Sequence, residues 1–436
     1  MGTLDAHVQR IGRALVATFL LAGCLPAETG TADETGATEG AQTTGSTGAT
    51  TDSSTTGGPS DPPEVVVEEG LFAGPVDAAI VDGRPAVAYA WLSTDGVEVH
   101  FARAASPTGD GPWTVRPVAV AGASLLSMRL ITLDDGRPAA AFFMEKDTTA
   151  GQVYALADDT DGLGDWSTSV IPDAGSGMSS WNDLALVGSV PTMCFARASQ
   201  MRIAQPESNP DGTGTWFEVP IPTPDEVAGA SPTACAVLEH DGAPGVVFSM
   251  ANGGGGAPLG IYLAVPDGDL ATATWTTSQV VPGVPVRTAG FWALGRLAEG
   301  PFAIAFGDEF DFALHLATAA PGDPLAPWND TVLLPEPPLA TEYAALSMTR
   351  DGPVPAIAYD GEHPFESRYG VFLLRRDAGE WSDPLPIHTR ADTIAGLPEV
   401  SSTAVVSLPD GAGTGVAYDA WWPEENRGEI RFAVQP

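Results

Sequence analysis

The chain is poor in positive charge. Its 436 residues include 19 Lys and Arg against 56 Asp and Glu, Lys146 is the single lysine, and the formal net charge is −37. Such a surface repels phosphate backbones and anionic lipid headgroups. We therefore expect no nucleic-acid partner, whereas cations, basic proteins and neutral glycans fit this charge.

The sequence also lacks the motifs of common cofactor sites. The glycine run at 253–256 follows a predicted strand without the helix that would complete a phosphate site, and no Cys/His spacing matches a zinc site. The acidic run at 158–162 offers oxygen ligands for Ca²⁺ but lacks the regular spacing and distal Glu of a calcium loop. We expect a solvated turn there, with Ca²⁺ binding as the alternative, and no other metal or cofactor.

What the chain does contain is one stretch repeated seven times. Asp82-Gly83-Arg84-Pro85 leads into a short apolar run that closes on Tyr89. Related runs close on six further aromatic residues, Phe142, Phe195, Phe248, Phe306, Tyr359 and Tyr418. Successive closing aromatics are 53, 53, 53, 58, 53 and 59 residues apart. A nearly constant period indicates one supersecondary unit copied along the chain.

Each copy carries short apolar runs separated by turn residues, a pattern typical of β-strands. In the first copy they are residues 78–81, 85–90, 97–103 and 114–120, and Asp-Gly joins the first two as in a hairpin. A tryptophan announces the fourth run in six copies, beginning with Trp113. Four antiparallel strands repeated radially predict an all-β fold, a β-propeller of seven four-stranded blades.

The seventh copy ends after its third strand, because residues 429–434 are followed only by Gln435 and Pro436. A β-forming segment, residues 64–68, precedes the first complete copy. Pairing this segment with the last blade would close the ring and remove an exposed sheet edge. We predict that residues 63–436 form one propeller closed by this N-terminal strand.

The N-terminus has the organisation of an export signal. Basic residues precede an apolar run at 14–21 that is too short to span a bilayer, and small residues follow it. Leu21-Ala22-Gly23-Cys24 resembles the bacterial lipobox. The resemblance implies that residues 1–23 are removed, and that Cys24 then carries several acyl chains, which anchor a protein stably. It further implies a bacterial envelope lipoprotein, in the outer membrane or at the cell surface. An ordinary secretory signal is the alternative.

Residues 24–62 read as a tether. From residue 25 on they contain no aromatic residue, no Lys and no Arg, and Thr, Gly, Ser, Ala, Asp and Glu predominate. This composition buries too little apolar surface to offset the entropy of ordering. A flexible segment of this length would span roughly 30 to 35 Å.

Two cysteines remain besides Cys24. Cys194 falls on the predicted second strand of the third copy, and Cys235 on the first strand of the fourth. An oxidising compartment would let them pair, contributing about 4 kcal/mol in the chain-entropy model. Two buried free thiols that fill space are the alternative.

The repeats resemble those of seven-bladed, sialidase-like propellers of bacterial surface proteins. The best matches are Ala358-Tyr359-Asp360 and Ala417-Tyr418-Asp419. Sialidases carry an Asp-box, Ser-x-Asp-x-Gly-x-x-Trp, between third and fourth strands, and only fragments of it are present here, namely Ser106, Asp161, Asp211 and Asp323 ahead of their tryptophans. The resemblance implies a shared fold more than a shared activity.

Functional residues are sought among those that do not repeat, because a polar residue at a recurring position belongs to the scaffold. Non-repeating polar and aromatic residues gather after the second strands and in the connections between blades, which should face one rim. Trp421 and Trp422 are our first choice for a contact surface, with two tryptophans that fold back over their own blade as the alternative. The candidate ligand-binding rim comprises Trp421, Trp422, Asp419, Glu424, Asp360, Glu362, His363, Asp308, Arg129, Arg287, Arg390 and Tyr343.

Three functions fit these residues. We favour a monomeric binding module without catalytic residues, whose rim recognises a glycan, a peptide or an envelope protein through stacking and carboxylate hydrogen bonds. A sialidase-type glycosidase would use Arg129, Arg287 and Arg390 to grip a carboxylate, and Tyr343 beside Glu342 as nucleophile. A structural envelope scaffold is the third.

Overall fold

The computed structural model divides the chain into two units, residues 1–58 and 59–436. It describes residues 62–70, 72–93, 96–122, 125, 127–146, 149–172, 178–252, 258–282, 292–298, 300–308, 311–321, 323–337, 344–350, 352–365, 368–390, 400–422, 425 and 427–436. The predicted signal, Cys24 and the predicted tether up to residue 61 lie outside this part. Within it, no helix is long and apolar enough to cross a membrane.

Seven antiparallel sheets of at least four strands form the second unit. Blade 1 contains β2 (Phe72–Val81), β3 (Arg84–Ser93), β4 (Gly96–Ala104) and β5 (Trp113–Gly122). Blade 2 contains β6 (Met128–Thr132), β7 (Pro138–Lys146), β8 (Thr149–Ala157) and β9 (Trp166–Pro172). Blade 3 contains β10 (Met178–Val187), β11 (Val190–Arg197), β12 (Gln200–Pro206) and β13 (Trp216–Pro220). Blade 4 contains β14 (Ala230–His240), β15 (Ala243–Asn252), β16 (Pro258–Asp267) and β17 (Thr274–Pro282).

The remaining three blades follow the same plan. Blade 5 contains β18 (Trp292–Arg296), β19 (Phe302–Gly307), β20 (Leu314–Thr318) and β21 (Asn329–Leu334). Blade 6 contains β22 (Ala344–Met348), β23 (Ala356–Glu362), β24 (Tyr369–Asp377) and β26 (Leu385–Arg390), with the short β25 (Glu380–Trp381) beside β24. Blade 7 contains β27 (Thr403–Ser407), β28 (Thr414–Trp422), β29 (Arg427–Gln435) and β1 (Glu64–Gly70). Short 3-10 turns occur at Asp225–Val227 and Pro409–Gly411.

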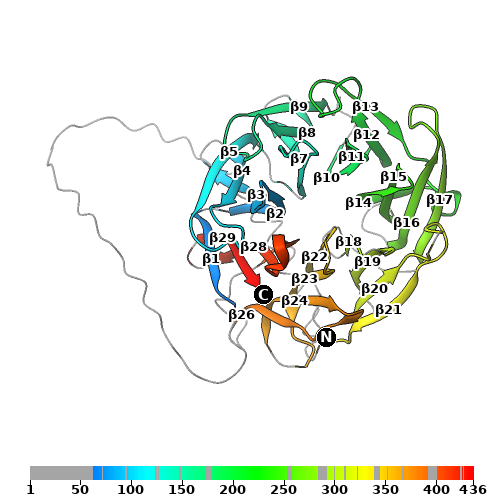
Figure 1. Ribbon diagram of the computed structural model, residues 1–436. Coiled ribbons are helices and arrows are strands. Elements are labelled where there is room, and N and C mark those ends of the chain that lie inside the picture. Colours follow the sequence, from blue (N-terminus) through cyan, green and yellow to red (C-terminus); the bar gives the residue numbers. More distant parts are fainter. Residues whose placement is uncertain are drawn as a thin grey trace, which may run out of the picture. The chain divides into compact units, whose positions relative to one another are not determined.

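The predicted seven-bladed ring closed by the N-terminal strand is confirmed (Figure 1). First strands such as β2, β10, β14, β18 and β22 lie innermost, and fourth strands such as β5, β9 and β17 lie outermost. The β1 strand pairs with β29 at the outer edge of blade 7. One detail differs from the expectation, because Trp381 lies on β25 and does not open the fourth strand of blade 6.

The first hairpin shows why the Asp-Gly signal is reliable. Asp82 and Gly83 both have positive φ, 49° and 68°. Two consecutive left-handed residues match the right-handed twist of the flanking strands, and Asp and Gly adopt this conformation with little strain. Asp241 and Gly242 repeat the arrangement in blade 4, with φ of 52° and 78°.

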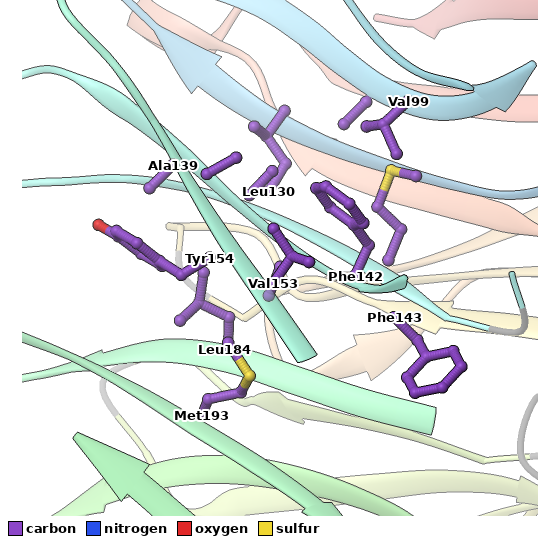
Figure 2. Packing of buried hydrophobic residues seen from close by; sticks show 14 of the residues in the cluster. Val99, Leu130, Ala139, Phe142, Phe143, Val153, Tyr154, Leu184 and Met193 are labelled. Atoms are coloured by element: carbon purple, nitrogen blue, oxygen red, sulfur yellow. The ribbon is translucent and has the colours of Figure 1, made fainter. Parts of the chain in front are cut away.

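The core is a series of apolar layers between neighbouring blades. All seven closing aromatics are at most 1% exposed. Figure 2 shows one such layer, in which Phe142 and Tyr154 of blade 2 lie among residues of blades 1 and 3, such as Val99 and Leu184. Both faces of these strands are therefore covered, which explains their nearly continuous apolar runs.

One aromatic contact recurs between blades. The Phe101 ring of blade 1 lies 5.3 Å from that of Trp166 of blade 2, and Tyr154 lies 5.1 Å from Trp216 in the same way. Phe432 of blade 7 lies 5.1 Å from Trp113 of blade 1. The junction where the ring closes thus uses the same packing as two internal junctions.

Strand β1 is held by a carboxylate on each of its faces. Glu64 accepts hydrogen bonds from the Tyr418 hydroxyl (2.5 Å) and His388 Nδ1 (2.9 Å), and it pairs with Arg431. On the blade 1 side, Glu68 accepts from the Tyr89 hydroxyl and lies 3.1 Å from His100 Nδ1.

A β-bulge makes this double contact possible. The register of β1 against β29 shifts between Val66 and Glu68. Residues four apart on a regular strand point to the same face. One extra residue, Val67, moves Glu68 to the opposite face from Glu64. The closing strand therefore contacts both neighbouring blades.

We predict that Glu64→Ala lowers the free energy of unfolding by about 3 kcal/mol, because Tyr418 and His388 lose their acceptor and the half-buried Arg431 keeps only Glu429 as a carboxylate partner among the described residues. Burial raises the pKa of Glu64, but His388, Tyr418 and Arg431 lower it overall. The contribution should thus be present above about pH 4.3, the unfolded value, and be lost as pH falls through the folded pKa.

Urea denaturation of wild type and variant between pH 3 and 7 measures both effects. Glu69 is an exposed residue of the same strand. The Glu69→Ala variant serves as the control and should unfold like wild type. Equal midpoints for Glu64→Ala and Glu69→Ala would contradict the assigned role of Glu64.

Candidate functional site

Charged side chains occupy one position of the innermost strands. We call the axial position the first-strand residue that pairs with the residue just before the closing aromatic. It is Asp77, Arg129 and Asp183 in blades 1, 2 and 3, by pairing with residues 88, 141 and 194. In the other four blades it is small, namely Ala236, Ala293, Ser347 and Ala404. The three charges are therefore consecutive around the centre of the ring.

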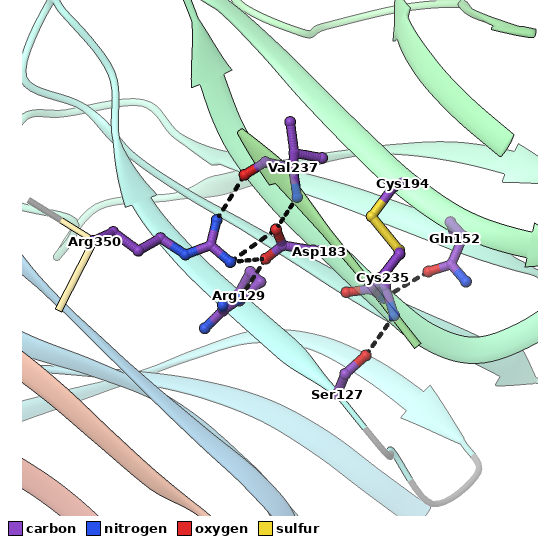
Figure 3. The surroundings of a disulfide bond; sticks show 9 residues. Ser127, Arg129, Gln152, Asp183, Cys194, Cys235, Val237 and Arg350 are labelled. Carbon is purple, nitrogen blue, oxygen red and sulfur yellow. Dashed lines mark hydrogen bonds and ion pairs between the residues drawn. A yellow bond between two sulfur atoms is a disulfide. The ribbon is translucent and has the colours of Figure 1, made fainter. Parts of the chain in front are cut away.

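These charges form one central network, which Arg350 completes. Figure 3 shows its Arg129, Asp183 and Arg350 members. The Arg129 guanidinium pairs with Asp183 through Nε and lies 3.4 Å from Asp77 through an Nη atom. Arg350 follows β22 of blade 6, and one Nη atom lies 2.8 Å from each carboxylate oxygen of Asp183. The network thus joins blades 1, 2 and 3 to blade 6.

Backbone donors complete the coordination of both carboxylates. The Val237 N–H donates to Asp183 (2.6 Å), and the Leu130 N–H donates to Asp77 (2.7 Å). The Asp183 side chain is 1% exposed. Burial raises its pKa, but the charges of Arg350 and Arg129 lower it overall, whereas burial prevails at Asp77 and raises the pKa there.

The members of this network serve as partners for one another. Asp183 has two guanidinium partners and a backbone donor, so it offers no accessible lone pair to a substrate. Arg129, a predicted rim residue, is neutralised by two aspartates and lies on the first strand of blade 2. Its guanidinium therefore already has two carboxylate partners within the scaffold.

A disulfide lies beside the network. The structure joins Cys194 to Cys235, with Cα atoms 6.2 Å apart. Cys194 pairs in register with Asp183, and Cys235 is two residues before Val237. Blades 3 and 4 are thus linked by a covalent bond from β11 to β14 and by the Asp183–Val237 hydrogen bond from β10 to β14 (Figure 3).

The predicted rim residues do not assemble into one described site. Asp419, Glu362 and His363 are buried, between 0% and 8% exposed. Asp360 lies half-buried on β23, and Asp308 lies in the hairpin of blade 5. Glu424, Arg287 and Tyr343 lie outside the described residues, as does the side chain of Arg390.

Trp421 and Trp422 are half-buried, not fully exposed. The Trp422 ring is covered by two cations, with the guanidinium carbons of Arg427 and Arg431 at 4.2 and 5.3 Å from its centroid. Both arginines also pair with Glu429. The strand ends that carry Trp422 and Arg427 therefore pack against each other.

Asp419 binds the two residues that precede β27, the first strand of blade 7. Its carboxylate accepts from Ser401 N (3.0 Å), Ser401 Oγ (2.7 Å) and Ser402 N (2.7 Å). Ser402 Oγ in turn accepts from Val76 N (3.1 Å) in blade 1. Burial raises the pKa of Asp419 to about 7 despite these donors. We assign this residue to closure of the ring, because its contacts are made within the scaffold.

The Asp-box fragments are structural turns. Asp161 accepts the Leu163 N–H (2.9 Å), and Asp323 accepts the Leu325 N–H (3.2 Å). Each tryptophan that follows donates its indole N–H to the carbonyl four residues earlier, at 3.1 Å for Trp166 and 2.8 Å for Trp328. The fragments thus close the turn between third and fourth strands.

One arginine bridges the junction between blades 1 and 2, and another bridges the junction between blades 2 and 3. Arg103 of blade 1 pairs with Asp82 of its own first hairpin (2.9 Å) and with Asp161 of blade 2 (3.3 Å). Arg137 of blade 2 pairs with Asp135 (2.7 Å) and with Asp211 of blade 3 (3.2 Å) in the same manner. An arginine from one blade thus joins two turn aspartates across the junction.

The junction of blades 4 and 5 keeps both aspartates and lacks the arginine. Asp241 is equivalent to Asp82, and Asp323 is equivalent to Asp161, as the turn geometry shows. Val265 occupies the strand position of Arg103, directly after the run at 262–264. Ala243 stands where Arg137 does. The Asp241 side chain is 89% exposed, and Asp323 is exposed as well.

A cleft of about 570 Å³ lies at this junction. One wall is apolar and rigid, with Phe302 among three prolines, Pro301, Pro321 and Pro324. The other wall is the blade 4 hairpin, which carries Glu239, His240 and Asp241. Arg296 lies between them, its guanidinium 4.4 Å from the Phe302 ring centroid. The blade 4 hairpin therefore places carboxylates opposite an aromatic and proline surface of blade 5.

The search for non-repeating residues missed this cleft, because the cleft is marked by the lack of an arginine at a repeating position. Aligning the third strands would have placed Val265 opposite Arg103. The axial positions were equally readable from the period, since Asp77, Arg129 and Asp183 are 52 and 54 residues apart. Arg350 had no such signal, because it lies outside the strand.

No protein-family model matches the chain, and no curated protein sequence matches it. Among solved structures, the NanB sialidase of Streptococcus pneumoniae (K499G mutant) is similar at 8% identity and TM-score 0.42, covering 84% of this chain and 68% of that one. The Penicillium chrysogenum α-L-arabinanase is similar at 13% identity and TM-score 0.47, covering 86% and 99%. A GH43 endo-arabinanase of Bacillus licheniformis is similar at 13% identity and TM-score 0.36, covering 58% and 92%. The likeness is one of fold.

We predict that Arg350→Leu lowers the free energy of unfolding by about 3 kcal/mol, because the buried Asp183 carboxylate loses one of its two cations. Chemical denaturation measures the loss. Arg296→Leu, which removes an arginine from the equivalent end of the first strand in blade 5, should change stability by less than about 1 kcal/mol. A stability gain in Arg350→Leu would contradict a bracing role and favour a strained functional site.

Proposed function

We propose that this protein is a non-catalytic recognition module of the bacterial cell envelope, lipid-anchored through Cys24, which binds a partner polypeptide in the cleft between blades 4 and 5. The observation that carries the proposal is the pair of exposed aspartates, Asp241 and Asp323, at a junction where the bridging arginine is replaced by Val265 and Ala243. The predicted anchor would place this cleft outside the cytoplasm.

The chemistry of the cleft favours a basic side chain supplied by the partner. At the junctions of blades 1 and 2 and of blades 2 and 3, a guanidinium joins the two equivalent aspartates. A partner arginine could make the same pair of charge-assisted bonds, which are stronger than neutral ones. Glu239, Asp241 and Arg296 line the cleft, and the exposed Asp323 precedes the lining residue Pro324. The formal charges of these three carboxylates and one guanidinium sum to about −2.

The apolar wall favours a polypeptide over a free cation. The three prolines lie beside Phe302, whose ring Arg296 covers, and form a surface on which the stem of a partner arginine and its neighbouring residues can lie. A rigid wall lowers the entropy lost on binding. The net charge of −37 further accelerates association with basic partners and opposes association with acidic ones.

A glycosidase is less well supported by the described residues. Asp183 is saturated by its partners, and Arg129 is neutralised by two aspartates. The described charged groups at the centre of the ring therefore serve one another. A glycosidase would instead need two carboxylic groups open to a sugar.

An array of random hexapeptides, each with one fixed residue, tests the proposal. We predict that the full chain, fluorescently labelled, binds members with a fixed arginine more strongly than those with citrulline or Glu. Asp241→Asn should lower the affinity for the best arginine peptide by about 10- to 100-fold, because a charge-assisted bond contributes about 1.5 to 3 kcal/mol.

Asp82→Asn is the matched control, since Asp82 is the equivalent residue of blade 1 and already pairs with Arg103. It should leave peptide affinity unchanged. Equal signals for arginine and citrulline peptides, or equal losses in both variants, would refute recognition at the blade 4–5 cleft.

A further inference from the structure

A cluster of potential metal ligands lies in blade 5, apart from the cleft. Asp308 follows β19, Asp311 lies in the hairpin, and His315 is on β20. Each offers one donor atom, and these three atoms lie within 4.8 Å of one another. Asp311 Oδ2 is 3.2 Å from His315 Nε2. Two ligands bound to one ion at about 2.0 to 2.1 Å in tetrahedral geometry are about 3.3 Å apart.

The His315 ring is fixed in the orientation that a ligand needs. Its Nδ1 lies 3.0 and 3.2 Å from the two oxygens of Asp330, on the neighbouring strand β21. The ring stacks on Phe306, with centroids 5.1 Å apart, and the residue is 8% exposed. When Nδ1–H donates to Asp330, the Nε2 lone pair points at Asp311. Metal-binding histidines are typically held by a carboxylate on the far nitrogen in this way.

His100 occupies the same strand position in blade 1 and serves as a comparison, because its partners belong to the scaffold. It also lies between two carboxylates, Glu68 at 3.1 Å and Glu98 at 3.0 Å. Glu68, however, is already the acceptor of the Tyr89 hydroxyl and belongs to the clasp of β1. Around His315, three carboxylates converge on one imidazole, and a bound cation would offset their mutual repulsion.

We propose that Asp308, Asp311 and His315 form a binding site for a divalent transition-metal ion, with Asp330 as the residue that positions His315. The site goes beyond the recognition function and does not depend on it. One imidazole and two carboxylates suit Zn²⁺ and Mn²⁺, and intrinsic affinity ranks Zn²⁺ higher. Ca²⁺ takes six to eight oxygen ligands and should bind more weakly. Three protein ligands leave a coordination position open to water or to a partner's side chain.

Calorimetric titration of the full chain, stripped with EDTA and desalted, tests this site. We expect one equivalent of Zn²⁺ to bind at pH 7.5, at least tenfold more tightly than Mn²⁺ or Ca²⁺. His315→Asn and Asp311→Asn should each abolish binding, whereas Asp330→Asn should weaken it by about 10- to 100-fold, since it keeps all three ligands. Asp323→Asn, an exposed aspartate of the same blade, should bind like wild type.

Thermal melts in EDTA separate loss of the site from loss of the fold. Asp311 is half-exposed, so Asp311→Asn should melt like wild type without metal and should lose the Zn²⁺-dependent rise in Tm. If His315→Asn fails to fold, Asp308→Asn replaces it. No Zn²⁺ binding by wild type, or wild-type binding by a folded Asp311→Asn, would overturn the proposal and leave His315 as a scaffold residue held between Asp311 and Asp330.

Discussion

The antiparallel pairing of β1 with β29 joins the two ends of the propeller, and the junction between blades 7 and 1 depends on it. Its strength comes from both faces of a single strand. Glu64 serves blades 6 and 7, and the bulge at Val67 turns Glu68 toward blade 1. With this strand in place, Phe432 can pack on Trp113 as the equivalent residues do at other junctions. Closure therefore completes a repeated interface.

The junctions share their apolar packing and differ in their charges. Aromatic contacts recur between blades, whereas the arginine bridge is present at two successive junctions and absent between blades 4 and 5. The stability of the ring rests on the shared packing, so one junction can lose its bridge without opening the sheet edges. Asp241, with His240 at 3.5 Å, and Asp323 then face solvent, and Asp241 lines a cleft that has a proline wall. In a repeat protein, a site can arise by removing a scaffold residue as well as by adding a new one.

The central network has the opposite character. Charges at the axial positions of blades 1 to 3 are new relative to the small residues of the other four blades, yet they are satisfied by one another and by Arg350. Novelty in the repeat is therefore a poor guide to function unless the partners of the residue are also known. Arg129 illustrates this, because its non-repeating charge is used within the scaffold.

Much of the fold was predictable from the sequence, because a period near 53 residues, the Asp-Gly turns and the tryptophans each report on local structure. Closure by residues 64–68 followed from counting strands. The bulge at Val67 was not predictable, since it depends on packing against two blades at once. The contacts of Arg427 and Arg431 with the Trp422 ring were not predictable either. They depend on the register in which β28 pairs with β29 and on the directions of the side chains. The pairing of Cys194 with Cys235 was left open by the sequence, since it requires the geometry of adjacent blades.

The most direct measurement restores the missing bridge. In Val265→Arg, the new guanidinium should join Asp241 to Asp323, as Arg103 joins Asp82 to Asp161. The account predicts that this variant loses affinity for arginine-containing peptides while its melting temperature stays equal to or above that of wild type. A folded Val265→Arg that binds such peptides as wild type does would contradict the central claim, that recognition takes place where the scaffold lacks its arginine.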